Sequence, residues 1–166
     1  MLKDANAAQI GGAGRSEMEF SAARKSPGFI DLWKTLPGNV EAVWPFVDRL
    51  TSFLAGSPGA NGNRFEIELA LREALVNAIV HGNKEDPRKR VHVRCRLTTD
   101  GEVSMTVQDE GPGFEHDGVA DPTAPENRLR AQARGIYLMR TLMDEVVFEK
   151  GGSAVHMRKR AKSAGT

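Results

Sequence analysis

The spacing of apolar residues predicts two helices in the first half of the chain. Between residues 40 and 54, apolar side chains recur at steps of three and four, so they share one helix face: Val40, Val43, Trp44, Val47, Leu50, Phe53 and Leu54. A Pro-Gly turn at residues 37–38 precedes this helix, and Asn39 can cap it. After a turn rich in Gly, Pro and Asn, residues 64–81 are apolar in nearly every direction, which predicts a mostly buried second helix.

Alternating apolar positions predict the strands. Residues 29–36 have a strand-like composition, and residues 91–97 and 103–107 alternate on either side of an Asp-Gly turn. A helix from Gly135 to about Met143 precedes two more strands, at 146–149 and 153–157, which are joined by a Gly-Gly turn. This order favours a two-layer α+β fold, with helices on one face of a mixed, mostly antiparallel sheet.

Two segments lack a periodic pattern. Residues 1–26 contain few large apolar side chains, so we expect a mostly mobile N-terminal tail, in which residues 18–22 could add an edge strand. Residues 114–134 also show no periodicity, and a loop of that length inside a compact domain is typically functional or disordered. The prediction is therefore one domain over residues 27–160, followed by a short tail at residues 161–166.

The composition describes a single soluble globular domain and excludes several function classes. The 23 Lys and Arg against 22 Asp and Glu give a net charge of +1, so no long-range field attracts nucleic acid or an anionic membrane. No apolar run approaches the length that spans a bilayer, and residues 1–10 have no hydrophobic signal core, so we expect a cytoplasmic protein. Cys95 is the single cysteine, which argues against disulfides and a Cys-based zinc cluster.

Three polar side chains stand out among the predicted core positions. Glu73 and Asn77 lie one turn apart on the mostly buried second helix, and Asp109 ends the inward-facing row of a strand. Burying such groups without partners costs about 1–3 kcal/mol each or more, so each needs a polar group opposite it. For Glu73 and Asn77 alone, structural hydrogen bonds are the simpler explanation.

Two glycine segments indicate where phosphates could bind. Gly111 and Gly113 follow Asp109 directly, and glycines there permit positive φ and a close approach. Gly135 opens the predicted third helix after Arg134, and a helix N-terminus offers free N–H groups to phosphate oxygens. Either signal alone is equally typical of an ordinary turn or cap. The sequence contains neither the P-loop nor the Rossmann glycine motif, so a nucleotide would need another fold.

Taken in order, four segments resemble the GHKL ATPases: ELALREALVNAIVHGNK (68–84), DEGPGF (109–114), RGIYLMRTLMDEV (134–146) and GGSAVHMRK (151–159). More narrowly, they resemble the anti-sigma factor serine/threonine kinases of bacterial partner-switching systems. The resemblance implies the Bergerat α/β sandwich, ATP and Mg²⁺, and a sigma factor or similar regulatory target as a partner. It also implies an antagonist protein whose Ser or Thr accepts the phosphate, and it allows a homodimer.

The resemblance also implies a role for each matching residue. Glu73 matches the general base, Asn77 matches the Mg²⁺ ligand, and Asp109 matches the carboxylate that accepts from the exocyclic amine of adenine. The other matches surround the nucleotide: Gly111 and Gly113 in the first glycine box, residues 114–134 as the ATP lid, Arg134 near phosphate or a partner's acidic groups, Gly135 beside the phosphates, and Ser153 supporting the adenine pocket.

These roles predict a protein serine/threonine kinase that is also an anti-sigma factor. Relatives commonly read G-R-G where this chain has Ala133-Arg134-Gly135. The extra Cβ of Ala133 motivates an alternative, a nucleotide-dependent protein-binding module of the same fold without efficient phosphotransfer. A histidine kinase domain is disfavoured because no helical hairpin with an acceptor His precedes the domain in this chain.

Overall fold

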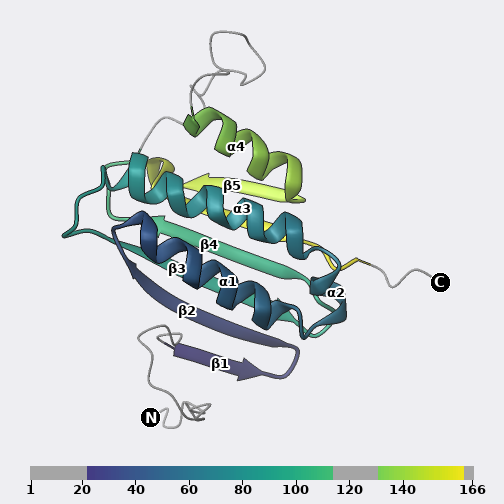
Figure 1. Cartoon of the computed structure of the whole chain (residues 1–166). Coiled ribbons are helices and arrows are strands. Elements are labelled where there is room, and N and C mark those ends of the chain that lie inside the picture. The colour runs from purple at the N-terminus through teal and green to yellow at the C-terminus, as the bar shows by residue number, and fades with distance from the viewer. Residues whose placement is uncertain (1–21, 114–130, 163–166) are drawn as a thin grey trace.

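The computed structural model describes residues 22–113 and 131–162. Its sheet has the strand order β1-β2-β3-β4-β6-β5, and every neighbouring pair is antiparallel. The strands are β1 (Ala22–Ser26), β2 (Phe29–Pro37), β3 (Arg90–Thr98), β4 (Val103–Asp109), β5 (Glu145–Glu149) and β6 (Ala154–Lys159). Helices α1 (Val43–Leu54), α3 (Arg64–Val76) and α4 (Ala131–Leu142) cover one face of the sheet (Figure 1). The predicted two-layer α+β fold is therefore confirmed, with an antiparallel rather than a mixed sheet in the described residues.

The hydrophobic core lies between the helices and the sheet. Leu50 of α1, Leu71 and Leu75 of α3, and Met105 of β4 are among its fully buried side chains. Figure 1 shows α3 between α1 and α4, and α3 contacts both of these helices. This central position explains why apolar residues surround nearly the whole of α3. It also places any polar residue of α3 that faces α4 or the sheet in a largely dry environment.

Helix α3 continues into a π-helical segment, Asn77–Gly82, instead of ending as a regular helix. The N–H of Asn83 donates to the C=O of Ala78, five residues earlier, at 2.8 Å. Segments of this kind are rare and frequently occur at functional sites. The apolar spacing predicted one uniform helix over residues 64–81. Apolar spacing does not distinguish the α-helical from the π-helical hydrogen-bond pattern, because both bury nearly the same face over this short segment. The π-helical segment starts at the predicted site residue Asn77.

Several element boundaries differ from the sequence predictions. Residues 22–26, assigned to the N-terminal tail, form β1 at the edge of the sheet and pair with β2. A short helix, α2 (Pro58–Asn61), lies within the predicted turn. Helix α4 starts at Ala131, so the last residues of the predicted loop are helical. Lys162, assigned to the C-terminal tail, donates through Nζ to the C=O of Gly62 at 2.6 Å.

Parts of three predictions lie outside the described residues. These are the N-terminal tail at residues 1–21, the ATP lid at residues 114–130 and the end of the C-terminal tail at residues 163–166. None of the helices in the described part of the chain has the length and apolar character that crossing a bilayer requires.

Candidate functional site

Asn77 and Asp109 line the same pocket, which lies on the helix-covered side of the sheet. The pocket is narrow in this conformation, with a cavity volume of about 20 Å³. The other lining residues are mostly apolar and come from α3, the π-helical segment, α4, three strands and the turn before β6: Ala74, Ala78, Val107, Met139, Phe148, Gly152, Ser153 and Val155. Apolar walls with a few convergent polar groups are typical of small-molecule sites. The structure thus brings together Asn77, Asp109 and Ser153, which the sequence analysis selected separately.

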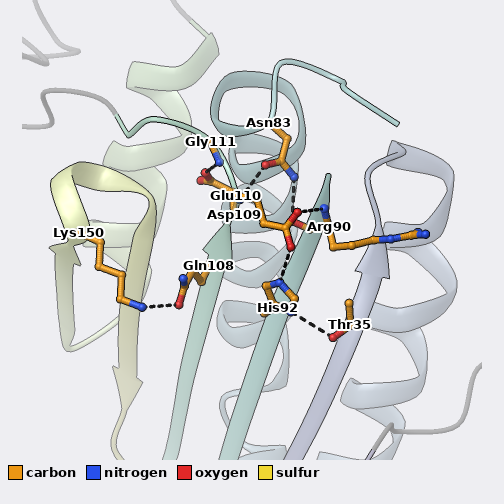
Figure 2. Close-up of polar contacts among 9 residues, drawn as sticks. All are labelled: Thr35, Asn83, Arg90, His92, Gln108, Asp109, Glu110, Gly111 and Lys150. Atoms are coloured by element: carbon orange, nitrogen blue, oxygen red, sulfur yellow. Dashed lines mark hydrogen bonds and ion pairs between the residues drawn. The ribbon is translucent and has the colours of Figure 1, made fainter. Parts of the chain in front are cut away.

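Asp109 is a buried carboxylate at the end of β4, with 5 % of its surface exposed. Its backbone N–H donates to the C=O of Ser153 at 2.9 Å. Its Oδ1 accepts from the N–H of Gly111 at 2.8 Å, a contact that Figure 2 shows. Burial raises the pKa of the Asp109 carboxyl, and the hydrogen bond from Gly111 opposes this rise. A Cβ added at Gly82 would overlap the carboxylate, so the end of the π-helical segment packs directly against it.

Both glycines of the DEGPGF segment are required by close backbone contacts. A Cβ added at Gly111 would overlap the C=O of Gly82, and one added at Gly113 would overlap the C=O of Gly151. Gly113 also has a φ of +84°, which side chains other than glycine rarely adopt. The turn after β4 therefore packs against the π-helical segment and against the turn before β6. Both glycines therefore permit the close backbone packing that surrounds Asp109.

Gly135 brings α4 onto the stripe of α3 that carries Glu73 and Asn77. A Cβ added at Gly135 would lie 2.7 Å from Glu73 Oε2 and 3.1 Å from Asn77 Nδ2. Because α4 begins at Ala131, Gly135 lies one turn inside the helix. The prediction that Gly135 opens the helix and offers a free N–H group is therefore wrong for this conformation. What the glycine provides here is room for a close approach of the two helices.

The side-chain amide of Asn77 is buried and unsatisfied. Asn77 is 8 % exposed, and its Nδ2 has no hydrogen-bond partner among the described residues. An unpaired buried donor costs about 1–3 kcal/mol, so this position favours a bound polar ligand. The described residues include no group of three or more His, Cys, Asp or Glu side chains that could hold a metal ion. An Mg²⁺ ion needs few protein ligands, and Asn77 Oδ1 with oxygens of substrate and water would fit it.

Glu73 faces α4 as a half-buried carboxylate. Burial raises its pKa, and the positive charge of Arg134 partly opposes this rise. Arg134 itself is exposed in the first turn of α4, which leaves its guanidinium accessible to an anion. Glu73, Asn77, Arg134 and Gly135 thus form one cluster between α3 and α4. Asn77 links this cluster to the pocket that contains Asp109.

Ser153 lies at the opposite wall of the pocket, just before β6. It is 9 % exposed, and its Oγ donates to the C=O of Lys150 at 3.0 Å. The hydroxyl therefore also stabilises the tight turn over Lys150–Gly152, in which all three residues have positive φ.

Two residues of this region were missed by the sequence analysis. Gly82 contacts Asp109, and Asn83 is fully buried between β3 and β4. A glycine near the end of an apolar helical run was the available signal, because such a position commonly marks a helix end or a close contact. No local pattern indicated the role of Asn83, whose partners are the first residue of β3 and the residue directly after β4.

Comparison with known proteins places this geometry in a family. The model of the histidine kinase-like ATPase domain matches residues 36–159. The chain belongs to the histidine kinase-like ATPase family. Among curated proteins, it is 34% identical over 159 residues to an anti-sigma F factor of Geobacillus thermodenitrificans (strain NG80-2), covering 90% of this chain and 96% of that protein.

One further relative agrees with the family assignment, and one solved structure agrees with the fold. The serine-protein kinase RsbW of Bacillus subtilis (strain 168) is 36% identical over 101 residues, which cover 57% of this chain and 62% of that kinase. A crystal structure of the RsbU and RsbW domains of Rv1364c from Mycobacterium tuberculosis matches with a TM-score of 0.55 at 20% identity. That match covers 81% of this chain and 33% of the other, and it supports the fold alone. The resemblance to GHKL ATPases of the anti-sigma factor kinase group is thus confirmed, whereas the roles of single residues stay predictions.

The close approach at Gly135 leads to a first prediction for this ATPase domain. In Gly135→Ala, the new Cβ would lie 2.7 Å from Glu73 Oε2, so α4 or the Glu73 side chain must move. We expect ATP affinity to fall about tenfold, as for one lost hydrogen bond. Helix propensity favours Ala over Gly by about 1 kcal/mol, which limits the loss of stability. Calorimetric titration with ATP and a thermal melt would measure both, with Thr141→Ala, on the exposed side of α4, as the control.

Proposed function

We propose that this chain is a cytoplasmic, ATP- and Mg²⁺-dependent protein serine/threonine kinase that acts as an anti-sigma factor in a partner-switching system. It would bind a sigma factor or a similar regulatory target and phosphorylate a Ser or Thr of an antagonist protein. The observation that carries the proposal is the pocket that brings the buried amide of Asn77 together with the buried carboxylate of Asp109. The unpaired Nδ2 donor of Asn77 suits an acceptor such as a phosphate oxygen, whereas Oδ1 is the atom that would face Mg²⁺. The names of the relatives, anti-sigma F factors and a serine-protein kinase, support the same activity.

One end of the site would bind the adenine base of ATP, and the other end would bind Mg²⁺ and the phosphates. Asp109, fixed at the end of β4, would accept a hydrogen bond from the exocyclic amine of adenine, and Ser153 would support the opposite wall. Asn77 would hold Mg²⁺ through Oδ1, and the ion would neutralise phosphate charge. The glycines at 111, 113 and 135 would allow the segments around the nucleotide to pack closely against one another.

Glu73 is the group best placed for proton transfer. In the proposed reaction, the hydroxyl oxygen of the antagonist's Ser or Thr attacks the γ-phosphorus, the bond between the γ-phosphorus and the β,γ-bridging oxygen breaks, and ADP leaves. Glu73 accepts the hydroxyl proton, a role that its burial-raised pKa favours. Arg134, whose charge acts on Glu73, is available to phosphate oxygens. Phosphoryl transfer depends mainly on such positioning and charge neutralisation, which these residues could supply.

The alternative is a nucleotide-dependent protein-binding module of the same fold, without efficient phosphotransfer. Its motivation is Ala133, which stands where relatives commonly have glycine. Ala133 is buried within the first turn of α4, and its φ is not positive, so this conformation accommodates its Cβ without backbone strain. The structure therefore favours neither function at this position. A homodimer, which the resemblance allows, is compatible with both.

Transfer of label from γ-labelled ATP to the cognate antagonist protein tests the proposal. We expect label on a Ser or Thr of the antagonist, and none when Mg²⁺ is chelated. Asn77→Ala should lower the Mg²⁺-dependent ATP affinity by about 10- to 100-fold, as for lost interactions with charged groups. Asn61→Ala on α2, where Asn61 is exposed, is the control and should behave as the wild type.

Each negative outcome of this experiment has a distinct meaning. ATP binding without any transfer of label would favour the binding module. An unchanged ATP affinity in Asn77→Ala would contradict the role of Asn77. Failure of the wild-type protein to bind ATP would contradict both functions.

A further inference from the structure

Asn83 connects three backbone segments beside Asp109. It follows Gly82 at the end of the π-helical segment and is fully buried. Its Nδ2 donates to the C=O of Arg90 at 2.9 Å, and its Oδ1 accepts from the N–H of Glu110 at 2.8 Å. Figure 2 shows the side chain between the start of β3 and the end of β4. One carboxamide thus satisfies a backbone acceptor at the start of β3 and a backbone donor directly after β4.

These two hydrogen bonds lie where the next backbone pair between β3 and β4 would otherwise form. The last pair in register is Val91 with Asp109, so Arg90 would pair next with Glu110. In an antiparallel ladder, every second pair of opposite residues is joined by backbone hydrogen bonds. Thr98 and Glu102, at the other end of the two strands, form such a pair, because the N–H of Thr98 donates to the C=O of Glu102. Counting along the register in steps of two makes Arg90 and Glu110 a hydrogen-bonded pair as well.

The direct bonds of that pair are taken over by side chains. The N–H of Arg90 donates to Glu110 Oε2 at 3.0 Å, and its C=O accepts from Asn83. The strands therefore separate directly after Asp109, and the Asn83 carboxamide fills the gap. The point at which β4 leaves the sheet is fixed by a residue that belongs to the helix layer.

This arrangement controls the position of Asp109 from two directions. On the β6 side, the N–H of Asp109 is held by the C=O of Ser153 at 2.9 Å. On the β3 side, the next N–H along the chain, that of Glu110, is held by Asn83. The Asp109 carboxylate also packs against Gly82, the residue before Asn83. Without the Asn83 side chain, the backbone N–H of Glu110 would lose its partner, and the side-chain bonds of Glu110 to Arg90 and His92 would be left to hold the end of β4 against β3.

We propose that Asn83 is a positioning residue for recognition of the adenine base, acting through Asp109. This inference rests on the proposed function, in which Asp109 accepts from the exocyclic amine. A hydrogen bond weakens steeply when its distance or angle departs from the optimum. Loss of the Asn83 carboxamide therefore weakens the contact to the base. The phosphate end at Asn77 and Glu73 keeps its geometry, because in the described residues the side chain of Asn83 bonds to Arg90 and Glu110 instead.

The ratio of ITP to ATP dissociation constants measures this effect directly. ITP carries a carbonyl oxygen where ATP has the exocyclic amine, so the wild-type protein should bind ATP about 10- to 100-fold more tightly. In Asn83→Ala, we expect this preference to fall about fivefold or more, with the KM for ATP rising more than kcat falls. Because the ratio compares two ligands on the same folded molecules, a smaller folded fraction does not change it.

Asn63 offers a matched control for general loss of stability. It is 1 % exposed, and its Nδ2 donates to the C=O of Arg160 at 2.6 Å, at the opposite end of α3. Asn63→Ala thus removes the same kind of buried hydrogen bond far from Asp109. We expect a lower melting temperature, as in Asn83→Ala, with an unchanged preference for ATP. Asn83→Asp, which keeps the oxygen facing Glu110, should show an intermediate preference.

The outcomes separate this inference from the proposed function. If the wild-type protein binds neither nucleotide, the proposed function fails and the inference with it. If Asp109→Asn loses the preference for ATP while Asn83→Ala and Asn83→Asp keep it, the positioning role alone is overturned. Failure of both Asn83 variants to fold, seen by circular dichroism, would assign Asn83 a purely structural role and would also overturn it.

Discussion

Glu73→Gln is expected to slow phosphoryl transfer by about 10²- to 10⁴-fold, the usual contribution of a general base. The carboxamide has nearly the shape of the carboxylate, so the contact with Gly135 should persist, but it does not accept the proton of the incoming hydroxyl. ATP affinity should therefore stay close to that of the wild type. Single-turnover transfer from γ-labelled ATP and calorimetric ATP titration on the same preparation would separate the two effects.

The pH dependence of transfer should report the same carboxyl group. Burial raises the pKa of Glu73 above its usual value of 4.5, and the charge of Arg134 opposes the rise. Because only the ionised carboxylate accepts a proton, the transfer rate should fall as the pH falls through this raised pKa. The acid limb of the pH–rate profile should therefore lie above pH 4.5. Removing the positive charge in Arg134→Ala should move the acid limb to higher pH.

Glu68 provides the control for Glu73. It lies on the same helix, but its carboxylate forms an ion pair with Arg72 at 2.6 Å instead of facing α4. Glu68→Gln should leave transfer and ATP affinity nearly unchanged. An equal loss of transfer in Glu68→Gln, or a loss of ATP binding in Glu73→Gln, would contradict the assignment of Glu73 as the base.

The parts of the site that follow a simple period could be predicted from the sequence. The alternation of Val103, Met105 and Val107 placed Asp109 on the inward face of β4, and all four side chains are buried. A one-residue shift would turn the whole row to the other face, so a pattern of this kind specifies position strongly. The spacing of Glu73 and Asn77 likewise placed both on one stripe of α3, and both lie within 3.4 Å of a Cβ built at Gly135.

Other features were not predictable, because they depend on contacts between distant segments. The hydrophobic pattern reports which face of a helix is buried, and it does not distinguish α-helical from π-helical hydrogen bonding after Val76. β1 is an edge strand with the sequence AARKS, and its pairing with β2 leaves no apolar alternation to detect. The role of Asn83 depends on the C=O of Arg90 and the N–H of Glu110, which meet only in the folded sheet.

Gly135 shows how one residue type can serve two different purposes. The sequence led to an expected free N–H group at a helix start, because glycine is an accepted N-cap residue. The structure starts α4 at Ala131 and uses the glycine for close packing against Glu73. Residues 131–134 carry little apolar periodicity, so their helical conformation had no strong signal in the sequence.

Asp109→Asn is expected to change ligand binding and stability in opposite directions. ATP affinity should fall about 10- to 100-fold, since the charged acceptor for the exocyclic amine is replaced by a neutral amide. At the same time, the free protein should become more stable at pH 7, because a buried charge is removed while the oxygen that accepts from Gly111 can be kept. A gain of about 1 kcal/mol would raise the melting temperature by roughly 2–4 °C for a chain of this size.

The sign of the stability effect follows from the raised pKa of Asp109. Its folded-state pKa lies above the usual value of 3.8, so the folded protein binds a proton more readily than the unfolded chain. The stabilisation by the protonated carboxyl is complete below pH 3.8, and it is lost as the pH rises through the folded-state pKa. The difference in melting temperature between Asp109→Asn and the wild type should therefore shrink as the pH is lowered.

Asp31 supplies a matched contrast for this prediction. It is also buried, at 2 % exposure, but hydrogen bonds from Arg96 and Arg94 lower the pKa of its carboxyl. The stabilisation by the ionised Asp31 carboxylate is present above pH 3.8 and is lost as the pH falls through the lowered pKa. Asp31→Asn should therefore destabilise the protein at pH 7. If Asp109→Asn instead lowered the melting temperature as Asp31→Asn does, Asp109 would be a structural carboxylate with its own internal donors, and its role in binding adenine would be refuted.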